Sequence, residues 1–172
     1  MPPRVVLVGL PGSGKSSVGA ELARRLEVPF ADSDELVVAQ TGRSVSQIFA
    51  QQGEPVFRQL EAELIAEALG NFDGVLALGG GAVSTDAVRQ DLAASGVPVV
   101  LLTAGQDELV SRLAGTAHRP LLAGNAPARL AELAEAREPL YREVASVTVA
   151  TGGRCIEQVA AELSDQLAAE PS

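Results

Sequence analysis

The sequence predicts an α/β fold, in which helices pack on both faces of a mostly parallel sheet. Short apolar runs alternate along the chain with longer segments of helical periodicity, which is typical of strands joined by crossover helices. The chain has 172 residues, of which 47% are hydrophobic, so it can bury one sizeable core. A glycine-rich loop joins the first apolar run to the first helical segment. We therefore expect residues 1–172 to form a single domain.

Five short apolar runs predict five strands, at residues 5–8, 29–31, 75–78, 97–102 and 147–149. Between them, apolar residues recur three or four positions apart, as at Phe57, Leu60 and Leu64, and this spacing predicts helices. The helices are expected near residues 15–27, 33–41, 44–51, 54–69, 85–94, 106–114, 127–136, 138–144 and 155–168. The stretch 114–127 is rich in Gly, Ala and Pro and predicts a mobile loop.

Charge and composition exclude several classes of protein. The chain has 13 basic and 22 acidic residues, a net charge of −9 and only 3% aromatic residues, which disfavours a nucleic-acid-binding surface. One Cys and one His exclude a disulfide within the chain and a Cys/His metal cluster. No apolar run reaches the roughly 18 residues of a membrane span. We expect a cytoplasmic, monomeric protein with no nucleic-acid or membrane partner.

The only lysine, Lys15, lies within Gly9-x4-Gly14-Lys15-Ser16, between a predicted strand and a predicted helix. This is the pattern of a P-loop, in which backbone N–H groups, here of residues 12–14 (Gly12, Ser13, Gly14), surround phosphates. The lysine then reaches the terminal phosphates, and the hydroxyl of Ser16 coordinates Mg²⁺. The alternative is a glycine turn with an exposed lysine, which would match this pattern by chance about once in a thousand times. The motif therefore predicts a nucleotide-binding protein.

Two carboxylates, Asp32 and Asp34, follow the second predicted strand. In an extended segment, residues i and i+2 face the same side, and this edge of a parallel sheet is where ligands bind. Asp32 could then hold Mg²⁺, and Asp34 could accept a proton from a substrate hydroxyl. Alternatively, one of the two caps a helix that begins near Glu35.

Two further segments point to a second ligand. Arg58 and Glu61 are neighbours on a predicted helix, either as a surface ion pair worth a few tenths of a kcal/mol or as a guanidinium that Glu61 orients toward a carboxylate ligand. The run Gly79-Gly80-Gly81 ends an apolar strand and loses packing and backbone entropy. Close approach of a ligand to the backbone explains three glycines better than a plain turn does.

Taken together, the motifs resemble those of the shikimate kinase family. They occur in the family's order from residue 5 to about residue 154: Gly-x4-Gly-Lys-Ser, Asp-x-Asp, Gly-Arg-Ser at 42–44, Gly-Glu-x-x-Phe-Arg-x-x-Glu at 53–61, Gly-Gly-Gly-Ala at 79–82, Arg-Pro-Leu-Leu at 119–122 and Arg-x-Pro-Leu-Tyr at 137–141. The resemblance implies a three-layer P-loop fold with a five-stranded parallel sheet, a helical substrate-binding segment near 33–61 and a lid near 112–125. It also implies transfer of the ATP γ-phosphoryl group to the 3-hydroxyl of shikimate, a step of aromatic amino-acid biosynthesis.

On the substrate side, the resemblance implies that Asp34 contacts the hydroxyls of shikimate and acts as base or orienter. Arg58 and Arg137 would hold the substrate carboxylate, and the backbone of the run 79–81, Gly80 above all, would lie against the substrate.

On the nucleotide side, Asp32 and Ser16 would serve Mg²⁺, and Lys15 and the lid residue Arg119 would neutralise the transferring phosphoryl group. Arg154 matches a position near adenine. The P-loop ends in Ser17, where many members of the family have Thr.

Other interpretations stay open. Gluconate kinase shares the P-loop and the lid, although the glycine run with Arg58 and Arg137 is not expected in it. A kinase-like protein could bind nucleotide without turnover. A GTP-dependent switch would need an Asn-Lys-x-Asp motif, which a chain with Lys15 as its sole lysine cannot have. His118 is expected to be solvated, and Cys155 to be a partly buried residue without a chemical role.

Overall fold

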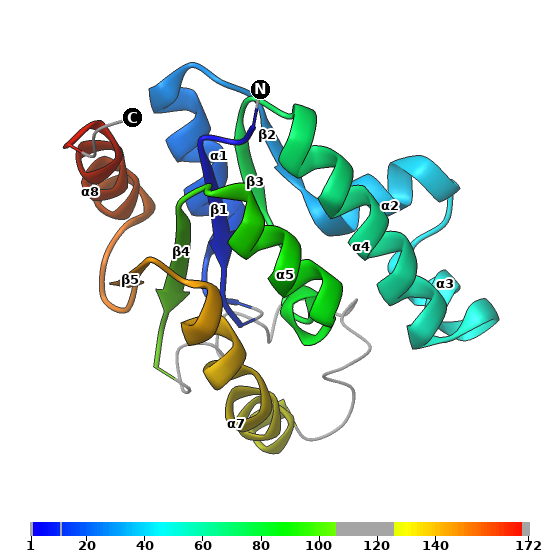
Figure 1. The fold of residues 1–172 in the computed structure, drawn as a ribbon. Helices are drawn as coiled ribbons and strands as arrows, with labels where there is room; N and C mark the ends of the chain where they lie inside the picture. The colour runs from blue at the N-terminus through cyan, green and yellow to red at the C-terminus, as the bar shows by residue number, and fades with distance from the viewer. Residues whose placement is uncertain (1, 11, 106–125, 170–172) are drawn as a thin grey trace.

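The computed structural model describes residues 2–10, 12–105 and 126–169, and it contains a five-stranded parallel sheet (Figure 1). The strands are β1 (Val5–Val8), β2 (Phe30–Asp32), β3 (Val75–Ala77), β4 (Val99–Thr103) and β5 (Val147–Ala150). Their order in the sheet is β2-β3-β1-β4-β5, and every neighbouring pair is parallel. The predicted α/β fold is therefore confirmed, with strand ends displaced by one or two residues.

The helices agree with the sequence to within two residues over most of the described chain. They are α1 (Lys15–Leu26), α2 (Ser33–Thr41), α3 (Val45–Gln52), α4 (Glu54–Asn71), the 3₁₀ turn η1 (Ala82–Ser84), α5 (Asp86–Ser95), α7 (Ala126–Val144) and α8 (Ile156–Ala169). None of the helices in the described part is long and apolar enough to cross a membrane. The helix predicted at 106–114 and the lid predicted at 112–125 lie outside the described residues.

Helices cover both faces of the sheet, and the alternation of side chains along β1 shows why. Val5 and Leu7 face the core formed with α1 and α8, whereas Val6 and Val8 face the core formed with α4, α5 and α7. Figure 1 shows these two groups of helices on opposite faces of the sheet. Because successive strand residues point to opposite faces, a wholly apolar strand such as β1 needs cover on both sides. The result is three layers, with helices on either side of the central sheet.

Beyond the edge strand β2, the chain forms a separate small cluster of helices. Figure 1 shows α2, α3 and α4 side by side there, and Val37 of α2, Ile48 of α3 and Phe57 of α4 form their common buried core. Ser44 accepts a hydrogen bond from the backbone N–H of Gln47, whose side chain bonds back to Ser44, and this capping box fixes the start of α3. This cluster supports α2 and α4, which supply Ser33, Asp34, Arg58 and Glu61 to the site described below.

Two local predictions are wrong. The sequence predicts two helices at 127–136 and 138–144, but α7 is continuous and contains Pro139. A proline inside a helix removes one backbone hydrogen bond, and here the packing of the buried Tyr141 in the core holds the helix together across it. Cys155 is exposed rather than partly buried, because it precedes α8 instead of lying within it.

Candidate active site

The glycine-rich loop after β1 wraps around the side chain of Lys15. Gly14 caps α1 with a φ of 98°, in the left-handed region that favours glycine. The Lys15 Nζ donates to the carbonyl oxygens of Gly9 at 2.7 Å and of Leu10 at 3.0 Å. The ammonium group is therefore held at the N-terminus of α1, where backbone N–H groups and the helix dipole already favour anions.

Asp32 has two separate partners, one for each carboxylate oxygen. Its Oδ1 accepts the backbone N–H of Asp34 at 2.9 Å and so caps α2, and its Oδ2 accepts the hydroxyl of Ser16 at 3.0 Å. The capping alternative is thus correct for Asp32, but the helix begins at Ser33, and the expected extended segment through Asp34 is wrong. Both carboxylates still face the same space, because Asp34 lies in the first turn of α2.

A cavity of about 290 Å³ lies between the loops that follow β1, β2 and β3. Its wall is formed by Gly12, Gly14, Lys15, Ser16, Ser17, Asp32, Asp34, Gly79 and Gly80. These loops meet because the carboxyl ends of parallel strands share one edge of the sheet. The Ser16 hydroxyl and the Asp32 carboxylate fit Mg²⁺, which takes hard oxygen ligands and usually few of them from the protein.

A smaller cavity of about 150 Å³ lies beside the P-loop and is lined in part by Ser13, Ser17 and Arg154. The Arg154 guanidinium donates to the carbonyl oxygen of Ala150 at 3.1 Å and forms an ion pair with Glu162. Arg154 is thus held next to the P-loop by the end of β5 and by α8.

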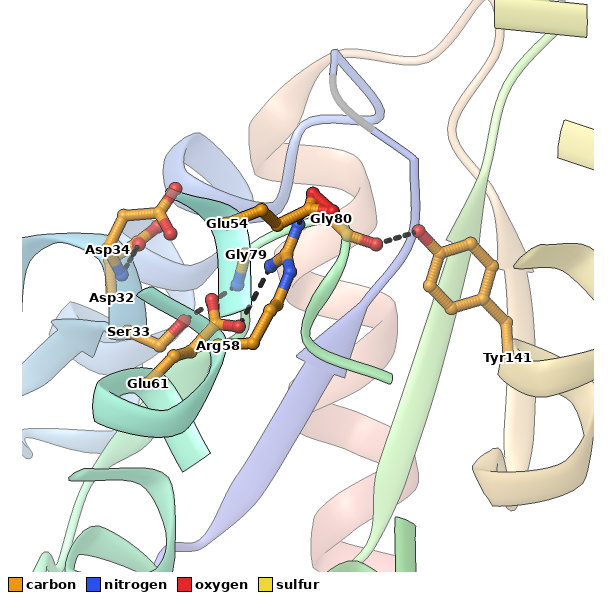
Figure 2. A network of polar contacts seen from close by, with 9 residues as sticks. All are labelled: Asp32, Ser33, Asp34, Glu54, Arg58, Glu61, Gly79, Gly80 and Tyr141. Atoms are coloured by element: carbon orange, nitrogen blue, oxygen red, sulfur yellow. Dashed lines mark hydrogen bonds and ion pairs between the residues drawn. The ribbon is translucent and has the colours of Figure 1, made fainter. Parts of the chain in front are cut away.

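Arg58 and Glu61 form an ion pair that is largely removed from water (Figure 2). Arg58 Nη1 lies 2.9 Å from Glu61 Oε1, and the Glu61 side chain is 0% exposed. Burial and, less strongly, the nearby Asp34 raise the pKa of the Glu61 carboxyl, whereas Arg58 and Arg137 lower it, and the net pKa is about 7. The surface-pair alternative is therefore excluded, because a surface carboxylate would be solvated.

The glycine run 79–81 makes room for charged side chains. A Cβ on Gly79 would lie 2.5 Å from Asp34 Oδ1 and 3.0 Å from Glu61 Oε2. A Cβ on Gly81 would overlap Arg58 Nη2 and lie 2.9 Å from Arg137 Nη2. The sequence predicts close approach of a ligand here; the structure adds close approach by the protein's own side chains.

Two hydrogen bonds hold this run in place, and sequence reasoning missed both. The Ser33 hydroxyl accepts the backbone N–H of Gly79 at 2.8 Å, and the Tyr141 hydroxyl donates to the carbonyl oxygen of Gly80 (Figure 2). Burial raises the pKa of Tyr141 to about 12, so its hydroxyl keeps its proton at neutral pH. The partners are 46 and 61 residues apart in the chain, and no local pattern pairs residues at such separations.

Arg137 of α7 completes the group of charged residues around Gly81. The residue is 6% exposed, and its Nη1 has no hydrogen-bond partner within residues 2–10, 12–105 and 126–169. A buried donor without a partner costs about 1–3 kcal/mol, so a site that keeps one is suited to an anion that would satisfy it.

The structure thus brings the predicted P-loop residues, Asp32, Asp34, Arg58, Arg137 and the glycine run to one edge of the sheet. Two residues of the predicted lid, His118 and Arg119, lie outside the described residues.

Comparison with known proteins gives concordant results. A family model described as shikimate kinase matches residues 11–168. A shikimate kinase of Streptomyces avermitilis is 49% identical over 165 residues, covering 96% of this chain and 95% of the relative. The structure of shikimate kinase from Acinetobacter baumannii in complex with shikimate has a TM-score of 0.92 and 34% identity, and covers 98% of this chain and 93% of that one.

A gluconokinase from Sinorhizobium meliloti is more distant, with 22% identity and a TM-score of 0.61, over 97% of this chain and 92% of that one. This likeness shows a shared fold alone.

Proposed function

Because the chain belongs to the shikimate kinase family, we propose that it transfers the γ-phosphoryl group of ATP to the 3-hydroxyl of shikimate, giving shikimate 3-phosphate and ADP. The observation that carries the proposal is the pair of guanidinium groups, Arg58 and Arg137, that converge on Gly81. The neighbouring loops also line the cavity beside Lys15. A site for a small carboxylate and a site for phosphates therefore adjoin.

On the substrate side, each charged group suits one part of shikimate. The carboxylate of shikimate is a planar anion that an arginine can hold with two parallel hydrogen bonds, and the unpartnered Nη1 of Arg137 is one donor that it would satisfy. Arg58 is held for the same task by Glu61. Asp34, which points at Gly79, would accept a hydrogen bond or a proton from the attacking hydroxyl. The backbone of Gly79 to Gly81 forms the floor of this site.

On the phosphate side, Lys15 and the backbone of residues 12–14 would bind the terminal phosphates. Ser16 and Asp32 would hold Mg²⁺, which when bound neutralises charge on the transferring phosphoryl group. Ser17 and Arg154 border the adjoining smaller cavity and would contact the nucleoside.

Several finer parts of the proposal rest on the sequence. The closing of Arg119 over the phosphates rests on the resemblance alone. We further propose that the chain works as one domain and as a monomer. Its location in the cytoplasm is supported by the single cysteine, which fits a reducing compartment.

A coupled assay of ADP release tests the proposal, with shikimate and gluconate as alternative acceptors. We expect Mg²⁺-dependent turnover with shikimate and none with gluconate. Lys15→Met should abolish turnover, with its folding checked by circular dichroism, because the sequence has no other lysine to replace the compact charge between the phosphates. Turnover on gluconate alone, or ATP binding without shikimate-dependent ADP release, would contradict the proposal.

A further inference from the structure

Glu61 holds a buried carboxylate oxygen that has no partner. The side chain is 0% exposed; Oε1 pairs with Arg58 at 2.9 Å, and Oε2 makes no hydrogen bond to any of the described residues. A Cβ on Gly79 would lie 3.0 Å from this Oε2, on the side where Asp34 Oδ1 also points. An ionised carboxylate in such a place is costly, because half of it is neither solvated nor bonded.

The charged groups that face Glu61 come from three helices. Asp34 lies on α2, Arg58 on α4 and Arg137 on α7 (Figure 2 shows the first two beside Glu61). Glu54, also on α4, lies 3.8 Å from Arg58 but is exposed. With Glu61 ionised, the negative charges of Glu61 and Asp34 balance the positive charges of the two arginines. A bound anion at the arginines adds one negative charge that no group in this set compensates.

We propose that shikimate binding is coupled to the uptake of one proton by Glu61 Oε2, so that Glu61 is a positioning residue whose charge responds to the substrate. The inference rests on the proposed function, since the anion is the shikimate carboxylate. The proton comes from solvent or buffer and forms an O–H bond at Oε2, which can then donate toward Asp34. It returns to solvent when the anion leaves.

The electrostatics of the free site support this coupling. Burial raises the pKa of Glu61 to about 7, so the carboxyl is already poised between its two states near neutral pH. A carboxylate ligand that also binds Arg58 weakens the attraction between Arg58 and Glu61, which is the main interaction that lowers the pKa of Glu61. The ligand also adds a second negative charge nearby, so both effects raise the pKa of Glu61 further. By linkage, shikimate affinity should fall by up to about tenfold per unit as pH rises above 7.

Isothermal titration of shikimate into the protein, without nucleotide, measures the proton directly. The titration is repeated at pH 7.5 in two buffers that differ in ionisation enthalpy. With a pKa of about 7 in the free protein, up to roughly 0.8 of a proton should be taken up per shikimate bound. Binding with no uptake in the wild-type protein would overturn the inference, whatever any variant does.

Two variants assign the proton to Glu61. Glu61→Gln should abolish the uptake and flatten the dependence of affinity on pH between 6 and 8.5. Glu54→Gln is the matched control, because Glu54 also faces Arg58 but is 48% exposed, and it should keep the uptake. Uptake that persists unchanged in Glu61→Gln would refute the assignment. If that variant fails to fold, the wild-type buffer comparison still decides the coupling.

The activity assay separates this inference from the proposed function. Shikimate-dependent ADP release without proton uptake would overturn the coupling and leave the function standing. Absence of both shikimate binding and turnover would overturn both.

Discussion

Replacing Arg137 with methionine should strengthen the fold and weaken substrate binding. Arg137 is 6% exposed, its Nη1 has no partner, and its Nη2 lies near that of Arg58 at Gly81. Methionine keeps most of the length of the side chain and removes the charge. Below pH 7, where Glu61 is largely protonated and its attraction to Arg137 is small, relief of the unpaired donor should raise the free energy of unfolding by about 1–3 kcal/mol.

The same substitution removes one of the two guanidinium groups proposed to hold the carboxylate. Truncating a buried charge contact costs about 2–5 kcal/mol of binding, so the KM for shikimate should rise by about 30-fold or more. Urea unfolding followed by circular dichroism measures the first effect, because the chain has no Trp for fluorescence. The ADP-release assay with varied shikimate measures the second.

Arg142→Met on the same helix is the control. Arg142 is 60% exposed and pairs with Glu138 at 2.8 Å, so its loss should change stability by less than about 0.5 kcal/mol and leave KM unaffected. A protein that Arg137→Met destabilises, with KM unchanged, would refute the reasoning and make Arg137 a structural residue.

Three further outcomes are expected. Gly81→Ala should displace Arg58 and raise the shikimate KM at least tenfold. A KM within twofold of the wild type would show that Arg58 can bind the substrate in another side-chain conformation. Ser33→Ala leaves the buried N–H of Gly79 unpaired and should lower the free energy of unfolding by about 1–3 kcal/mol in urea titrations; no loss would mean that the bond contributes nothing. From pH 5 to pH 8, the free energy of unfolding of the wild type should fall by about 2–3 kcal/mol relative to that of Glu61→Gln. The reason is that Glu61 loses its proton near pH 7 in the folded state but near pH 4.5 in the unfolded chain. Parallel pH profiles would contradict the raised pKa.

The layered fold and the P-loop could be predicted because their signals are local. A strand such as Val5–Val8 is apolar at every position, and the P-loop pattern from Gly9 to Ser16 lies within one continuous segment. The ends of helices were harder to predict from the sequence. Asp32 reads equally well as the end of a strand or as a cap, and in the fold its two oxygens serve Asp34 and Ser16 at once.

Contacts between residues far apart in the sequence could not be predicted, for a different reason. The break expected near Pro139 does not occur, because the packing of Tyr141 against the core outweighs one lost backbone bond. The bonds from Ser33 to Gly79 and from Tyr141 to Gly80 join segments 46 and 61 residues apart, so only chain folding brings them together.

The sequence by itself determined that Lys15 lies in the pattern of a P-loop and that Arg58 has Glu61 as its helical neighbour. Only the tertiary structure decided the environment of Glu61. Its carboxyl group is buried near charged residues of α2, α4 and α7, and one of its oxygens lies beside Gly79 without a partner among the described residues. Spacing along a helix fixes which residues are adjacent, but the free energy of a charge depends on solvent and on every charged group around it. That environment is assembled from distant parts of the chain.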